Sequence, residues 1–153
     1  MTPLMRRLSI LLFAAASLAN LATAQSLVLV TQEEAASSQA AGGLLSPRNT
    51  PPVVAPRIEL VAPDISKPVV VPTTIEIRFT GSAPAELKPE TFRLLYGAFR
   101  IDVTQRLLGV TKVTKEGIKV REAVLPSGRH QFALSVMDTL GREVVQVISF
   151  TVQ

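Results

Sequence analysis

The sequence predicts an all-β domain, a single antiparallel β-sandwich of seven or eight short strands. From Arg57 onward, apolar and polar residues alternate in short runs, which is the period of half-buried strands. Turn residues separate these runs at the spacing usual for sandwiches, and no long helical period interrupts them. A βαβ architecture is therefore not expected.

Each run places its large side chains on one face, because successive residues of a strand point to opposite sides of the sheet. The prolines flank the runs, where a missing N–H costs no ladder hydrogen bond. Alternation predicts the following inward residues, strand by strand: Ile58 and Leu60; Ile75, Ile77 and Phe79; Phe92, Leu94 and Tyr96; Ile101 and Val103; Val110 and Val113; Ile118 and Val120; His130, Phe132, Leu134 and Val136; Ile148, Phe150 and Val152.

Residues 1–24 have the features of a secretory signal peptide in the right order. Arg6 and Arg7 form the basic start, an apolar stretch follows, and residues 22–24 read Ala-Thr-Ala, the small-x-small pattern of a cleavage site. We expect cleavage before Gln25. The apolar stretch is too short and too interrupted to span a bilayer, so we expect no transmembrane anchor after processing and a periplasmic or secreted location.

Residues 25–56 are predicted to form a flexible Ala/Ser/Pro-rich leader, and residues 57–153 the sandwich domain. Two short parts of the leader have structural potential. The run SLVLVT, residues 26–31, can add a strand to a neighbouring molecule, add one to the edge of its own domain, or stay free as part of the leader. Residues 32–41 can form a short alanine-rich helix.

The charge balance does not favour a nucleic-acid partner. Removing Arg6 and Arg7 from the 16 basic residues leaves 14, against 12 acidic ones, hence a net charge of +2. The acidic residues are interspersed among the basic ones, and a single tyrosine offers little for base stacking. A solvated, mildly basic surface is the expected interpretation.

The only histidine, His130, and Asp138 share a strand face but lie roughly 26 Å apart at about 3.3 Å per residue, too far for a catalytic pair. We predict that His130 closes one end of the core and bonds to a loop carbonyl. Asp138 is predicted to accept backbone N–H groups in a turn where Gly141 has a positive φ.

The remaining residue types give no catalytic, cofactor-binding or metal-ligating set. The chain has no cysteine, and one histidine alone cannot make a common zinc or copper site. No serine lies in a Gly-x-Ser-x-Gly elbow and no Gly-rich phosphate loop is present. We therefore expect a protein that is not an enzyme and needs no cofactor.

The order of PRIELVAP, PTTIEIRFTGSAP, KPETFRLLYG with IDVT, LPSGRHQFALSVMDTLGRE and ISFTV resembles bacterial immunoglobulin-like domains, relatives of the fibronectin and cadherin sandwiches. The resemblance covers residues 57–153. It implies a spacer, adhesion or binding module of a secreted or envelope protein. The calcium sites of cadherin-like relatives are not expected, since Asp64, Asp102 and Asp138 stand without neighbouring carboxylates.

These observations predict a noncatalytic immunoglobulin-like interaction or structural module of the bacterial cell envelope. We expect contact with an envelope protein through a sheet edge or through the loop in YGAFR, where Tyr96, Phe99 and Arg100 form the candidate interaction surface. The alternative is a carbohydrate-binding accessory module or a small envelope polysaccharide hydrolase. A glycan site would need Tyr96 and Phe99 side by side at the surface.

Overall fold

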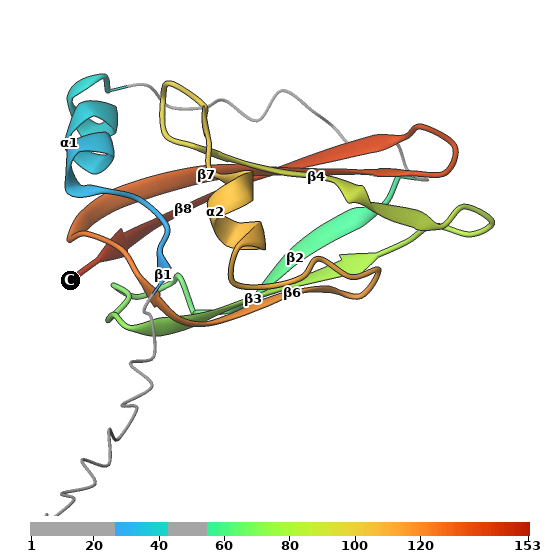
Figure 1. Cartoon of the computed structure of the whole chain (residues 1–153), viewed down its shortest axis with the longest axis horizontal. Coiled ribbons are helices and arrows are strands. Elements are labelled where there is room, and N and C mark those ends of the chain that lie inside the picture. Colours follow the sequence, from blue (N-terminus) through green and yellow to red (C-terminus); the bar gives the residue numbers. More distant parts are fainter. Residues whose placement is uncertain (1–26, 43–54) are drawn as a thin grey trace, which may run out of the picture.

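The computed structural model describes residues 27–42 and 55–153, which form two packed β-sheets (Figure 1). The predicted signal peptide, residues 1–24, lies outside the described residues, as do residues 25–26 and 43–54 of the predicted leader. The predicted fold class, an all-β antiparallel sandwich of seven or eight strands, is confirmed. No helix among the described residues is long and apolar enough to cross a membrane.

Each sheet has four strands. The first contains, in spatial order, β1 (Leu27–Val28), β6 (Gly117–Val124), β3 (Thr73–Thr80) and β2 (Arg57–Ala62). The second contains β5 (Ile101–Asp102), β4 (Leu87–Tyr96), β7 (Gly128–Asp138) and β8 (Glu143–Val152). All neighbouring strands are antiparallel except β1, which runs parallel to β6. The two helices are α1 (Gln32–Ala40) and α2 (Thr104–Leu108).

Alternation predicted most of the core correctly. The inward residues of β4, β7 and β8 are all buried, His130 among them, and so are most of those in β2, β3 and β6. Val110 is the exception, since it is 53% exposed in the loop after α2. Burial of large apolar side chains at about 25 cal/mol per Å² is the main favourable term that holds the sheets together.

The helix α2 was not predicted, because the stretch from Ile101 to Val113 has the composition of strands. Its start is determined by two short-range contacts. The Oδ1 atom of Asp102 accepts the N–H of Thr104 at 2.9 Å, and Thr104 Oγ1 accepts the N–H of Leu94 at 2.9 Å. The chain therefore turns away from β4 after two paired residues and buries Leu107 against the core.

The boundary predicted at residue 57 is wrong for part of the leader, because residues 27–42 belong to the domain. Leu29, Val30 and Ala35 are buried in the core, and β1 pairs with the end of β6. The predicted helix is confirmed as α1. It starts with a capping box, in which Thr31 Oγ1 accepts the N–H of Glu34 and the Glu34 carboxylate accepts the N–H of Thr31.

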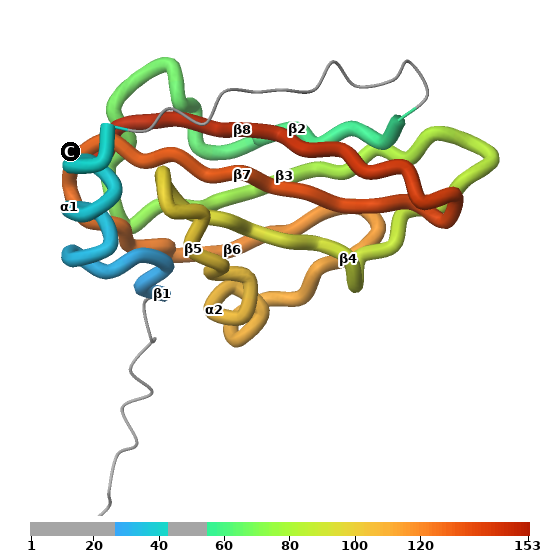
Figure 2. The backbone as a smooth tube through the Cα atoms, turned by 90° about the horizontal axis from the view of Figure 1, so that it is seen from above, coloured from blue at the N-terminus to red at the C-terminus, as the bar shows by residue number. Residues whose placement is uncertain are grey.

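The two long sides of the sandwich differ in what covers them. Figure 2 shows β1, β5 and α2 along one side, and the edge strands β8 and β2 along the other. On the β8 side, the loop that contains Val69 pairs with the last residues of β8. Val69 donates its N–H to Thr151 and accepts the N–H of Gln153.

Candidate functional site

The predicted interaction surface of Tyr96, Phe99 and Arg100 is only partly present. Tyr96 is fully buried, so its assignment to an exposed surface is wrong. It is the last residue of β4, where alternation turns its side chain into the core. Phe99 is 64% exposed and Arg100 is exposed, both in the turn between β4 and β5. The surface therefore loses one of its two aromatic rings.

This turn is held tightly against α1. Gly97 has a φ of 67°, and a Cβ atom placed on it would lie 2.2 Å from Ser38 Oγ of α1. The same Ser38 hydroxyl accepts the N–H of Ala98 at 3.2 Å. Arg100 closes the turn with a φ of 51° and donates its N–H to the Gly97 carbonyl at 3.1 Å. Phe99 is thus presented on a fixed turn rather than on a free loop.

Beneath the turn, Tyr96 and His130 form a buried polar pair. The Nε2 atom of His130 lies 2.7 Å from the carbonyl oxygen of Pro126, and Nδ1 lies 3.0 Å from the Tyr96 hydroxyl. A carbonyl only accepts, so Nε2 carries the proton and donates it; Nδ1 then accepts from the Tyr96 hydroxyl. The predicted bond from His130 to a loop carbonyl is confirmed.

Burial determines the protonation of this pair. It lowers the pKa of His130, since the charged imidazole would lose its hydration, and the bond to Pro126 opposes this only in part. Burial also raises the pKa of Tyr96, an effect to which the negative charge of Glu34 adds. Near neutral pH both groups are uncharged, and both ring nitrogens of His130 have partners within the protein. The histidine is therefore a structural residue.

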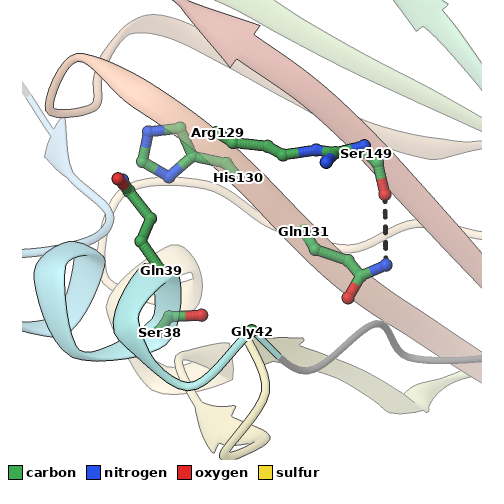
Figure 3. Close-up of a pocket in the computed structure, with 7 residues that line it drawn as sticks. All are labelled: Ser38, Gln39, Gly42, Arg129, His130, Gln131 and Ser149. Carbon is green, nitrogen blue, oxygen red and sulfur yellow. Dashed lines mark hydrogen bonds between the residues drawn. The ribbon is translucent and has the colours of Figure 1, made fainter.

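A polar depression of about 270 Å³ lies beside this pair, between α1 and the ends of β7 and β8 (Figure 3). In Figure 3, Gln131 and Ser149 face each other across the two strands, where Gln131 Nε2 donates to Ser149 Oγ at 3.2 Å. The full lining is Ser38, Gln39, Gly42, Arg129, His130, Gln131 and Ser149. These groups can bind a small polar molecule by hydrogen bonds, but they include no nucleophile with an adjacent base.

Asp138 stabilises the turn between β7 and β8, as predicted. Its Oδ1 accepts the N–H groups of Leu140 and Arg142 at 2.9 and 3.0 Å, and its Oδ2 accepts Arg142 Nε at 2.6 Å. Burial opposes ionisation of Asp138, but the hydrogen bonds from Arg142 outweigh it and lower the pKa of the carboxyl. Gly141 has the predicted positive φ, at 74°. These contacts within the turn account for the burial and the ionisation of Asp138.

The described residues contain no group of three or more His, Asp or Glu side chains that could hold a metal ion. The clusters of carboxylates and bases that do occur are ion pairs. Examples are Lys119 with Glu76 at 2.7 Å and Arg93 with Asp102 at 3.2 Å. Most of these groups are substantially exposed, so each pair contributes little to stability.

The outer edge of β8 is the feature that sequence reasoning missed. Thr151 and Gln153 direct their backbone groups outward, to Val69. Every second residue of a strand directs its N–H and C=O to the same side, so the backbone groups of Val145, Val147 and Ser149 also point outward. Among the described residues none of these three amides has a backbone acceptor on that side, and only the Val147 carbonyl is bonded, by Gln146 Nε2 at 3.0 Å.

Comparisons with known proteins give little further guidance. No protein-family model and no curated protein matches the chain. Among solved structures, it is similar to CopC from Methylosinus trichosporium OB3b, at 16% sequence identity and a TM-score of 0.40. That match covers 63% of this chain and 94% of CopC. A similarity at this level indicates no shared property beyond a general likeness of fold.

Proposed function

We propose that this chain is a noncatalytic interaction module of the bacterial cell envelope, which binds an extended segment of another polypeptide along the outer edge of β8. The observation that carries the proposal is a strand of ten residues at a sheet edge with no charged residue after Glu143. Such an edge is a template for another strand, and proteins ordinarily block it.

The other edges of the described sheets are blocked in the usual ways. β2 carries Arg57 and Glu59 and has an irregularity between Leu60 and Ala62. β5 is two residues long, and β1 covers the end of β6. Charges, bulges and short strands are the devices that prevent pairing between molecules. The absence of these devices from β8 between Val144 and Phe150 supports a binding role for that edge.

The noncatalytic part of the proposal is supported by how the reactive groups are used. His130 has both ring nitrogens bonded within the core, and Asp138 is committed to its turn. The envelope location is supported by the signal-peptide pattern of residues 1–24 and by the resemblance to bacterial immunoglobulin-like domains.

The two alternative modes have weaker support. A loop-mediated contact retains Phe99 and Arg100, which are exposed together on a fixed turn. A glycan-binding module would need an aromatic platform, and the burial of Tyr96 removes one of the two rings proposed for it. We therefore place the main contact at β8 and treat the turn as a secondary one.

Crosslinking capture from intact cells that express the tagged protein tests the β8 edge directly. A lysine at Val147 places a charge on the outer face at the middle of the edge, which opposes strand addition. Leu140→Lys is the matched control, since Leu140 is 63% exposed in the turn between β7 and β8. We expect Val147→Lys to abolish capture of the partner and Leu140→Lys to leave it unchanged.

The double variant Phe99→Ala, Arg100→Ala tests the turn in the same experiment. Both side chains are exposed, so their removal leaves the core intact. Loss of the partner in this variant, with retention in Val147→Lys, would show that the turn rather than the β8 edge makes the contact. The proposal would then be wrong.

A further inference from the structure

We infer that the segment taken up by β8 is β8 of a second copy of this chain, in an antiparallel pair with its two-fold axis at Val147. This inference rests on the proposed function, since it names the partner of the same edge. It follows from the length of the edge to which no other described strand pairs, the direction of its backbone groups and the side chains that the pairing would bring together.

Within residues 27–42 and 55–153, the unpaired length of the β8 edge is limited at both ends. Val69 already occupies the backbone groups of Thr151 and Gln153, so no other strand can pair there. At the other end, Glu143 carries the only charge of β8 and directly follows the turn. The segment that remains, Val144 to Phe150, is uncharged, and its midpoint is Val147.

The backbone groups that point outward match those of a second copy. Val145, Val147 and Ser149 direct their N–H and C=O groups away from β7, as shown by the contacts of Val69 and of the Gln146 side chain. In an antiparallel pair centred at Val147, Val147 meets its own copy and Val145 meets Ser149. Each such pair exchanges two N–H···O bonds, about six in total.

In this register, the β8 side chains of one copy can pack beside the β8 side chains of the other. On the outer face Val147 lies beside Val147 of the second copy, and on the inner face Val144 lies beside Phe150. Glu143 falls opposite Thr151, beyond the paired segment, so no like charges meet. The Gln146 amide that now bonds to the Val147 carbonyl is exposed, and an N–H of the second copy can replace it at little cost.

The pairing joins the two sheets that contain β8 into one continuous sheet across the two-fold axis. An interface made by one pair of edge strands is small, so we expect a dimer that depends on concentration rather than a permanent one. A covalent trap is therefore the most direct test. The chain has no cysteine, so a single introduced thiol reports on one position only.

We choose Val147→Cys in the mature chain, residues 25–153, under mild oxidation. Directly opposite residues of an antiparallel pair have Cα atoms about 5.5 Å apart, within the range of a disulfide. We expect Val147→Cys to form a covalent dimer at least tenfold faster than Leu140→Cys, although Val147 is half-buried and Leu140 is 63% exposed. Val145→Cys and Ser149→Cys should each remain monomeric alone and should crosslink when mixed.

Each result has a defined meaning. Equal rates for Val147→Cys and Leu140→Cys, together with a wild-type chain that sediments as a monomer at all concentrations, would overturn the pairing between copies. The proposed function would still hold if Val147→Lys abolished capture of a different protein. Rapid crosslinking of Val145→Cys alone would also overturn the inference, because it requires another register. If Val147→Cys does crosslink, wild-type dimers should be lost in Val147→Lys.

Discussion

The change Tyr96→Phe removes a single hydroxyl group and should destabilise the fold. The ring contact with Phe132, 5.0 Å between centroids, remains in the variant. The variant loses the bond that the hydroxyl donates to Nδ1 of His130 and the side-chain bond between the hydroxyl and Ser38. That nitrogen is then buried without a donor. An unsatisfied buried group costs about 1–3 kcal/mol, so we expect a loss of about 2 kcal/mol.

Urea unfolding at pH 7.5 of residues 25–153, the chain expected after cleavage, measures this loss. In thermal unfolding, a domain of about 100 residues should show a fall in Tm of about 8–10 °C. The protonation of His130 gives a second readout. Burial lowers the pKa of His130 in both proteins. A hydroxyl that donates to Nδ1 additionally favours the neutral ring, so its removal should shift the pKa of His130 upward. Since His130 is the only histidine, its ring proton gives one isolated NMR signal to titrate.

Two results would refute the reasoning about this pair. One is a change in unfolding free energy below about 0.5 kcal/mol, which would mean that the bond between the hydroxyl and Nδ1 contributes nothing net. The other is an unchanged titration of His130, which would mean that the hydroxyl does not donate to Nδ1. Leu140→Ala, in the exposed turn between β7 and β8, is the control that should alter neither readout.

Three further predictions follow from the same structure. Burial lowers the pKa of His130 below 6.5, so as the pH falls the unfolded chain binds a proton before the folded chain does. The free energy of unfolding should therefore be highest above about pH 6.5 and decline below it by up to about 1.4 kcal/mol per pH unit. His130→Gln should flatten this slope in urea titrations between pH 6.5 and 5. Bonds from Arg106 and from Thr31 lower the pKa of Glu34 to about 2, so the stability from this pair should be present above pH 4.5 and be lost as the pH falls towards 2. Glu34→Gln should cost about 1 kcal/mol at pH 7, a modest value because Arg106 is 40% exposed, and hydrogen exchange of the α1 amides should increase. Asp138→Ala should lower the Tm by several degrees, because the N–H groups of Leu140 and Arg142 lose their shared acceptor and the Arg142 side chain loses its ion pair, keeping its bond to the Ser82 carbonyl; a Tm equal to that of wild type would contradict the role assigned to this carboxylate.

The parts of the fold that sequence reasoning predicted correctly depend on local rules. The alternation in HQFALSVMD determines which face of β7 is buried, and a glycine three residues after Asp138 determines the turn. The core position of His130 follows from the same period. These features need no knowledge of which strands are neighbours.

The parts that were missed depend on contacts between distant segments. The sequence alone could not decide whether the run SLVLVT adds a strand to a neighbouring molecule or to its own domain. The pairing of Leu27–Val28 with β6 shows that these residues add to their own sheet. The sequence pattern placed Tyr96 both in the core and on an exposed surface. In the structure Tyr96 is the last residue of β4 and its side chain is buried in the core. The outer edge of β8 is a property of sheet order, which no local pattern encodes. The lack of charge after Glu143 is the one signal that was available in the sequence.

The pairing of β1 with β6 has a consequence for when the protein can fold. Leu29 and Val30 pack in a core that also contains residues of β8, the last strand of the chain. Residues that are synthesised early therefore find their core partners only after the last strand has been made. If cleavage occurs before Gln25 as predicted, the export signal ends directly beside β1. Closure of the core then has to wait until β8 has been made, and contacts between such distant segments slow folding.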